Sequence, residues 1–532
     1  MSTPPTDTIS GEGDRQRGSR RAIRWWPAVT VVLGSGLLVG LLCVSPDLPP
    51  QTRNIGLQLL LAASLLLLFV WWVLFSRGGL RSRFAIAATG LLLIALLGVS
   101  IRRVGVTGDL WLDVVWRWSS PAVATTNPRA AESSAEPVDL AETSATDFPQ
   151  FLGPHRDAKV HDVPLSRNWS RHRPTLLWRQ PIGSGWSSFA IVNQFAVTQQ
   201  QLGDSQSVVC YELTTGNTRW TYTYKAEFHS MLGGDGPRAT PTVDGGEVFT
   251  LGPTGVLNHL RGEDGTLIWS RNVLDDNDAQ NKEYGLSGSP LVVDDLVVVS
   301  AGGTEGKSLV AYDRRTGKIR WQGGNDRAGY SSPALATLSG VRQILVLNHH
   351  SVASHDPRTG KILWRYDWPG EEAKVPQPAV WQEDRLFVSS GFGAGCELLR
   401  LVVDASGMWH VRSLWRNRNM KPKFTNVVIR GRYVYGLDNG ILACLDLTSG
   451  KRQWKRGRYR HGQVLLVDDL LLVQAEFGDV VLVEARPDRH HELCRFAALD
   501  DRTWNNPALS GRYLLVRNNR EAACYELPLE KP

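Results

Sequence analysis

Aromatic and cationic side chains recur at one point of a repeated pattern in this sequence, just before a short apolar run. They are Trp186, Arg238, Tyr330, Phe424, His461 and Trp504. Aromatic faces beside a cation can stack on and clamp a flat anionic ligand or hold an extended peptide. We predict that these six residues form a ligand- or partner-binding mouth, and we predict no catalytic residue.

Histidine and aspartate clusters elsewhere lack the spacing of metal sites. The pairs His349-His350 and His490-His491 sit beside turns without the HExxH spacing of a zinc helix. The loop at residues 274–280 (LDDNDAQ) lacks the glycine and closing glutamate of an EF-hand. The sequence therefore predicts no metal site.

Six cysteines are widely separated, with neither a CxxC pair nor two adjacent cysteines. Cys210, Cys444 and Cys524 occupy matching places in three apolar runs, where a free cysteine behaves as a small buried hydrophobe. We therefore expect these cysteines to pack in the core and to form no disulfides.

A sequence motif that ends in tryptophan repeats along the chain. An apolar strand is followed by an acidic or polar residue, a Thr-Gly or similar turn and a tryptophan, as in VAYDRRTGKIRW and CLDLTSGKRQW. The spacing is that of one propeller blade. We expect a packing role for the tryptophans, which are Trp178, Trp220, Trp269, Trp321, Trp364, Trp415 and Trp454, with Phe496 in an eighth place.

Each repeat contains four short strands, so the sequence predicts an all-β fold, an eight-bladed β-propeller of four-stranded blades at residues 148–532. Residues 522–527 (AACYEL) have no following turn or tryptophan, whereas residues 176–182 (LLWRQPI) have no preceding partner. We predict that these two strands pair and close the ring. A small polar residue lies beside each mouth position and is expected to bond to backbone or channel water, at Ser188, Thr240, Ser289, Ser332, Gln377, Asn426, Gln463 and Asn506.

Three apolar stretches precede the propeller, at residues 27–44, 56–75 and 84–101. Each approaches the ~20 residues that cross a bilayer, so we predict three transmembrane helices. Arginines before the first stretch and between the second and third favour a cytoplasmic position for both segments. This predicts a multi-pass protein of the cytoplasmic (inner) membrane, with a basic cytoplasmic tail at 1–26 and the propeller facing the periplasm or exterior.

Residues 102–147 form a predicted juxtamembrane segment and flexible linker. Residues 108–120 contain three tryptophans and either lie on the outer membrane surface or pack under the propeller. The formal charge of +7 comes largely from the arginines that flank the membrane stretches, so we predict no nucleic-acid partner.

The repeat resembles the PQQ-binding-like β-propeller repeat proteins, over nearly all of residues 148–527. Residues 148–157 (FPQFLGPHRD) resemble a segment, WPQFRGPNRDG, that precedes many such propellers of the cell envelope. This chain has Phe148, Leu152, His155 and Ala158 where that segment has Trp, Arg, Asn and Gly. Residues 236–243 (GPRATPTV) and 457–463 (GRYRHGQ) also resemble stretches of that group.

The resemblance implies two different functions. Quinoprotein dehydrogenases of this architecture hold PQQ against a disulfide of adjacent cysteines and bind calcium through a Glu-Asn-Asp set, and neither feature is recognisable here. A lipoprotein of the outer-membrane assembly machinery instead scaffolds other proteins. We therefore expect a non-catalytic scaffold without cofactor, which binds an envelope protein, a peptide or a carbohydrate. The alternative is a PQQ-dependent oxidoreductase with a divergent site. A sensor that signals through the helices is a third, weaker hypothesis.

Overall fold

The computed structural model describes residues 24–45, 48, 50–75, 79–118, 138–141 and 143–530. The chain divides into two compact units, Met1–Ser120 and Pro121–Pro532, which are treated separately below. The arginines before residue 24 and most of the predicted linker lie outside the described residues.

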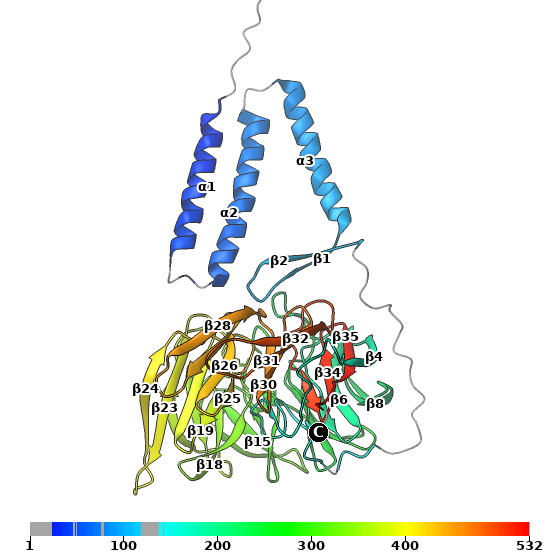
Figure 1. Ribbon diagram of the computed structural model, residues 1–532, viewed down its shortest axis with the longest axis vertical. Helices are drawn as coiled ribbons and strands as arrows, with labels where there is room; N and C mark the ends of the chain where they lie inside the picture. The colour runs from blue at the N-terminus through cyan, green and yellow to red at the C-terminus, as the bar shows by residue number, and fades with distance from the viewer. Residues whose placement is uncertain are drawn as a thin grey trace, which may run out of the picture. The chain divides into compact units, whose positions relative to one another are not determined.

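The first unit contains three helices that are long and apolar enough to cross a membrane (Figure 1). They are α1 (Trp26–Val44), α2 (Pro50–Val70), which continues as the π-helical turn η1 (Trp71–Phe75), and α3 (Leu80–Ser100). Their leucine and valine side chains are mostly exposed, as expected of helices whose natural surroundings are lipid.

A short hairpin follows α3, formed by β1 (Ile101–Val106) and β2 (Leu112–Trp116). Gln58 of α2 holds its turn, because Gln58 Oε1 accepts from the Leu112 amide at 2.9 Å and Gln58 Nε2 donates to the Leu110 carbonyl at 2.8 Å. Part of the predicted juxtamembrane segment is thus a β-hairpin attached to α2.

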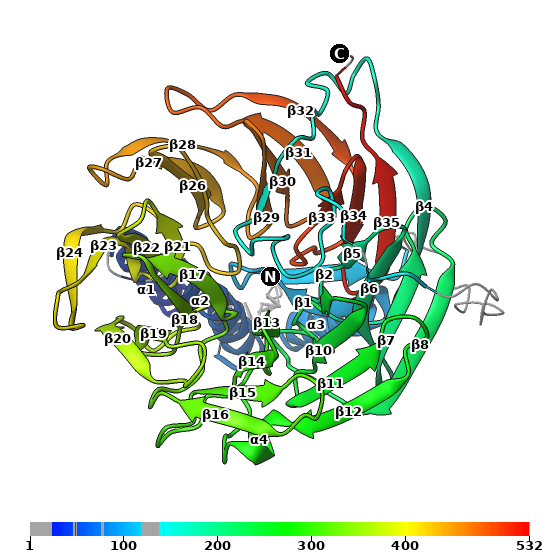
Figure 2. The same cartoon turned by 90° about the horizontal axis from the view of Figure 1, so that it is seen from below.

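The second unit is a ring of eight blades, each with four antiparallel strands (Figure 2). Alternating apolar runs fill the space between the blades, so the core is shared by neighbours. The first four blades are β5 (Ala190–Val192), β6 (Phe195–Leu202), β7 (Ser205–Glu212) and β8 (Thr218–Lys225); β9 (Thr242–Asp244), β10 (Glu247–Leu251), β11 (Val256–Arg261) and β12 (Leu267–Asn272); β13 (Leu291–Val293), β14 (Leu296–Ser300), β15 (Leu309–Asp313) and β16 (Ile319–Gly323); β17 (Ala334–Leu338), β18 (Val341–Leu347), β19 (Ser351–His355) and β20 (Ile362–Asp367).

The other four blades complete the ring, and the short helix α4 (Val273–Asp276) lies between blades 2 and 3. Blades 5 to 8 are β21 (Ala379–Trp381), β22 (Arg385–Ser390), β23 (Gly395–Val403) and β24 (Trp409–Asn417); β25 (Val428–Arg430), β26 (Tyr433–Asp438), β27 (Ile441–Asp446) and β28 (Arg452–Arg458); β29 (Gln463–Val467), β30 (Leu470–Gln474), β31 (Asp479–Glu484) and β32 (Glu492–Ala497), to which β3 (Lys159–Val160) is added; β33 (Ala508–Ser510), β34 (Tyr513–Arg517), β35 (Glu521–Glu526) and β4 (Thr175–Pro181).

The ring closes in blade 8 as the sequence predicts. Strand β4, from the start of the propeller, pairs antiparallel with β35 from its end, with Trp178 opposite Cys524. Arg179 reinforces the pairing, because its guanidinium donates to the buried Glu521 carboxylate at 2.7 and 2.8 Å. β35 is therefore paired on both sides, and β4 forms the outer edge of the blade as the fourth strand does in the other blades.

Neighbouring blades are joined by the tryptophans of their outermost strands. In six of the seven, the ring Nε1–H donates to a backbone carbonyl of the next blade at 2.7–3.0 Å. The pairs are Trp178 with Leu213, Trp220 with Gly262, Trp269 with Arg314, Trp321 with Pro357, Trp415 with Leu447 and Trp454 with Arg486. Trp364 instead donates to Gln343 Oε1 at 2.7 Å.

Five of the turns that receive a ring have a glycine against it, at Gly216, Gly265, Gly317, Gly360 and Gly450, and the glycine is needed for two reasons. Gly360 has a φ of +73°, and a Cβ at this position would lie 2.3 Å from the Trp321 ring. A side chain is therefore opposed both by the backbone conformation and by the tryptophan beneath the turn.

A leading segment, residues 148–160, lies against the innermost strands. Phe148 bridges to Ile191 of blade 1, and Leu466 of blade 7 donates its amide to the Ala158 carbonyl at 2.9 Å. The guanidinium of Arg156 donates to the carbonyls of Ser289 and Pro290 at 2.9 and 2.8 Å. This single segment thus contacts blades 1, 3 and 7.

The leading segment has a strained backbone. Leu152, Arg156 and Ala158 have φ values of +62°, +54° and +57°, a region that side chains disfavour. Ala158 stands where the resembling segment has glycine, which explains the preference for glycine there. The contacts with three blades hold the segment in this conformation.

The glycine turns can be tested with two matched substitutions. Gly360→Ala and Gly407→Ala both introduce a side chain at a positive φ, +73° and +83°, but only Gly360 has a tryptophan within reach, because nothing lies within 4 Å of a Cβ at Gly407. We expect Gly407→Ala to lower the free energy of unfolding by about 1 kcal/mol and Gly360→Ala to lower it by a further ~1–3 kcal/mol. Thermal and denaturant unfolding of the full chain in detergent measures both, and equal losses would contradict the packing of turn on ring.

Candidate functional site

The six predicted mouth residues lie on the crossovers that connect the outermost strand of one blade to the innermost strand of the next. The turns between second and third strands reach the same face, because the strands alternate in direction. We call this the crossover face. The structure divides the six residues into a compact aromatic cluster and two separate positions.

The aromatic cluster consists of Trp186, Phe424, His461 and Trp504. The Trp504 ring centroid lies 4.9 Å from that of Trp186 and 5.0 Å from that of Phe424, and Phe424 lies 5.5 Å from His461. These residues come from the crossovers into blades 1, 6, 7 and 8, so ring closure brings them together. Trp186 and His461 are buried, whereas Phe424 and Trp504 keep part of their rings exposed.

Glu476, in the turn between β30 and β31, orients two residues of the cluster by accepting a hydrogen bond from each. Trp504 Nε1 donates to Glu476 Oε1 at 2.9 Å, and the His461 amide donates to Glu476 Oε2 at 3.3 Å. The glutamate is itself 1% exposed. A buried carboxylate that accepts from both residues holds the indole and the histidine backbone in fixed positions.

Arg502 supplies a cation to the exposed side of the cluster. Its guanidinium carbon lies 4.7 Å from the Trp504 ring centroid and 5.9 Å from that of Trp186. Such a cation–π arrangement attracts the guanidinium to the faces of the two rings. The cluster therefore presents aromatic faces and one cation side by side.

Arg238 and Tyr330 lie outside this cluster of rings, but Arg238 adjoins it, because its guanidinium and the Trp186 indole donate to the same Gly233 carbonyl. The Arg238 guanidinium lies 4.5 Å from the Phe228 ring centroid and donates to carbonyls of its own loop, at Gly233 and Gly234. Burial lowers the pKa of Arg238 to about 10. Tyr330 packs against Tyr284, with ring centroids 5.6 Å apart, and forms a separate part of the crossover face.

The small polar residues beside the mouth form bonds between blades. The amide of Ser188 donates to Thr240 Oγ1 at 3.3 Å, that of Thr240 to Ser289 Oγ at 2.9 Å, and that of Ser289 to Ser332 Oγ at 2.9 Å. Each side chain accepts from the preceding blade, so this inner ring fixes the crossovers at a constant spacing.

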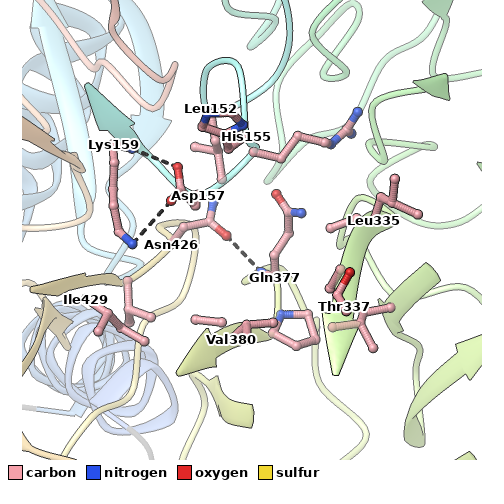
Figure 3. A pocket seen from close by; sticks show the side chains of 17 residues that line it. Leu152, His155, Asp157, Lys159, Leu335, Thr337, Gln377, Val380, Asn426 and Ile429 are labelled. Atoms are coloured by element: carbon pink, nitrogen blue, oxygen red, sulfur yellow. Dashed lines mark hydrogen bonds and ion pairs between the residues drawn. The ribbon is translucent and has the colours of Figure 1, made fainter. Parts of the chain in front are cut away.

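A pocket of about 230 Å³ lies between the leading segment and the innermost strands of blades 4, 5 and 6 (Figure 3). Asp157 and Lys159 form an ion pair at 3.2 Å on one side, and the amide of Gln377 donates to Asn426 Oδ1 at 2.8 Å on the other. The sequence did not indicate this pocket, because nothing in the leading segment shows where it docks.

The residues present do not fit the PQQ site that the resemblance implies. All six cysteines are free thiols, and burial raises the pKa of the Cys396 thiol to about 12. The rings of Trp186 and Trp504 pack on each other at 4.9 Å, whereas a flat cofactor between two rings needs roughly twice one stacking spacing.

Sequence reasoning missed Glu476 and Arg502. Glu476 lies in a turn between strands and not beside an innermost strand, where the candidate residues were sought. Arg502 lies two positions before Trp504, one step outside the aligned register. Comparison of the second turn of every blade would single out Glu476 as an acid in an apolar setting.

Two tryptophan substitutions can measure how much the hydrogen bond to Glu476 contributes to stability. Trp504→Phe removes a bond to a carboxylate, and Trp186→Phe removes a bond to the neutral Gly233 carbonyl at 2.6 Å. We expect losses in the free energy of unfolding of about 1.5–3 kcal/mol and about 0.5–1.5 kcal/mol respectively. Denaturant unfolding of the full chain compares the two, and a larger loss for Trp186→Phe would contradict the assigned role of Glu476.

Comparison with solved structures shows the fold. A quinohaemoprotein alcohol dehydrogenase from Comamonas testosteroni is 13% identical, with a TM-score of 0.52, and the alignment covers 73% of this chain and 82% of that one. The quinohaemoprotein alcohol dehydrogenase ADHIIG from Pseudomonas putida HK5 is 14% identical, with a TM-score of 0.50 and the same coverages. BamB from Moraxella catarrhalis is 14% identical, with a TM-score of 0.49, and the alignment covers 68% of this chain and 99% of that one.

No curated protein matches this sequence. A family model described as "Outer membrane protein assembly factor BamB" matches residues 204–456 and 348–486, more than half of the 532 residues. Together with eight four-stranded blades, this match shows that the chain belongs to the family of PQQ-repeat β-propeller proteins.

Proposed function

We propose that this protein is a membrane-anchored scaffold that binds a protein, a peptide or a carbohydrate of the bacterial cell envelope and performs no chemistry on it. The aromatic cluster with Arg502 carries this proposal. Aromatic rings contribute large contact areas at low entropic cost, and with an arginine they are the residues most often found at binding hot spots. The match to the BamB family model supports a protein or peptide as the bound partner.

The cytoplasmic membrane is the proposed location, with three spans and the propeller in the periplasm. Arg81 and Arg83 lie at the start of α3, and several arginines precede α1. Because arginines are enriched on the cytoplasmic side of membrane helices, we assign the start of α3 and the segment before α1 to that side. An odd number of spans then carries the propeller across the membrane.

The orientation can be tested with single cysteines in a Cys43→Ser background, since Cys43 is exposed, four of the five propeller cysteines are buried and Cys494 is only partly exposed. We expect a membrane-impermeant maleimide to label Thr215→Cys, in an exposed propeller turn, in intact spheroplasts. Ser82→Cys, near the start of α3, should react only after permeabilisation. The reverse pattern would place the propeller in the cytoplasm.

Partner binding can be tested by photo-crosslinking in the native envelope. A photoreactive phenylalanine analogue at Phe424, within the cluster, is compared with the same analogue at Met408, an exposed position in a turn of the opposite face. We expect one discrete adduct from position 424 and none from 408, and at least a ten-fold loss of the adduct when Arg502→Ala and Trp504→Ala are combined. Combined variants that leave the adduct unchanged would contradict binding at the cluster.

The oxidoreductase alternative makes the opposite prediction on the same purified chain. Titration with PQQ would then change the absorbance at one equivalent, and dye-linked turnover would follow on addition of an alcohol. We expect neither, because the packed rings and the buried free thiols do not form the site that such an enzyme needs.

A further inference from the structure

A second cluster on the crossover face contains His349, His350 and Glu371. The histidines occupy the turn between β18 and β19 of blade 4, and Glu371 lies in the crossover from blade 4 to blade 5. His349 Nε2 and His350 Nε2 each lie 3.3 Å from Glu371 Oε2. The two imidazole rings are perpendicular, with centroids 4.3 Å apart, so both Nε2 atoms and the carboxylate point toward one position.

Asp326 fixes the orientation and the tautomer of His350. Its Oδ2 accepts from the His350 amide at 3.1 Å and from Ser351 Oγ at 2.6 Å, which holds the buried carboxylate in place. Its Oδ1 lies 3.2 Å from His350 Nδ1. When Nδ1 carries the proton and donates it to Asp326, the Nε2 lone pair is left facing His349 and Glu371. Histidines that bind metals in proteins are oriented by a carboxylate in this way.

The distances suit joint coordination of one metal ion. Two ligand atoms, each about 2.0–2.1 Å from a zinc ion and separated by a tetrahedral angle, lie roughly 3.3–3.4 Å from each other. The two N···O distances of 3.3 Å match this value.

We propose that His349, His350 and Glu371 bind a divalent transition-metal ion, with Zn²⁺ as the ion that two imidazoles and one carboxylate favour. The Glu371 side chain is 83% exposed, so the fourth coordination position faces solvent and is open to water or to a partner's side chain. The nearby Lys374 donates its ammonium group to the carbonyls of Gly370 and Glu372, both at 2.7 Å.

A bound ion would tie the crossover between blades 4 and 5 to the turn between β18 and β19. The Tyr330 amide donates to the Lys374 carbonyl of that crossover at 2.7 Å, so the tie extends to a predicted mouth residue. The sequence analysis predicted no metal site at the two histidines, because no third ligand stands near them in the sequence. That ligand, Glu371, lies 22 residues after His349, in the crossover to blade 5. The metal site does not depend on the proposed scaffold function.

Cobalt and zinc titrations of the full chain in detergent, stripped with a chelator, test the site. We expect one Co²⁺ per chain with visible d–d absorption of a four-coordinate ion, and its displacement by Zn²⁺. Glu371→Gln should weaken binding at least ten-fold, and Asp326→Asn should weaken it about 10- to 100-fold through His350. The exposed Glu371 can be changed without disturbing the core, which makes Glu371→Gln the decisive variant.

The chain provides a matched control in its other pair of adjacent histidines. His490 Nε2 lies 3.0 Å from the Tyr459 hydroxyl and His491 Nδ1 lies 2.8 Å from Glu484, so each has its own partner and they do not converge. The double variant His490→Gln/His491→Gln should bind Co²⁺ like the wild type. Absence of stoichiometric binding, unchanged affinity in Glu371→Gln, or an equal loss in the control would overturn the proposal.

Discussion

Six of the seven blade tryptophans donate their ring N–H to a backbone carbonyl of the next blade, and five of these rings lie beneath a tight glycine turn. The contact combines apolar burial with a hydrogen bond that a blade cannot satisfy alone. Burying a tryptophan removes ~150–250 Å² from water, on the order of 4–6 kcal/mol before entropy is counted. Because the contact always joins one blade to its successor, it specifies a ring and not merely a stack of sheets.

The two departures from this rule have structural reasons. The outer hairpin of blade 5 has longer strands, β23 and β24 of nine residues each, and Trp364 of blade 4 donates to Gln343 within its own blade. In blade 8 no turn joins the third and fourth strands, because β35 and β4 come from opposite ends of the propeller sequence. Phe496 of blade 7, which has no N–H to donate, packs there against Tyr525 with ring centroids 4.8 Å apart.

The same distinction explains what could be predicted from the sequence. The blade number and the pairing of β4 with β35 follow from a repeated local pattern, and the structure confirms both. Most of the aromatic cluster was found because its residues share one register. The position of the leading segment, the carboxylate of Glu476 and the convergence of Glu371 on two histidines could not be found, because each depends on connections whose lengths and paths differ from blade to blade.

The residues of those connections can also change, and with them the binding surface, without destabilising the propeller ring. The tryptophan contacts and the inner ring of Ser188, Thr240 and Ser289 use backbone groups or small side chains, so they fix the blade positions whatever the crossovers contain. Rings from the crossovers of blades 1, 6, 7 and 8 thereby form a chain in which successive centroids lie 4.9–5.5 Å apart, although some of them are far apart in the sequence. A surface assembled in this way is rigid before any partner arrives, so little binding energy is lost in ordering it. That rigidity suits the proposed scaffold role, in which the propeller holds a partner in place.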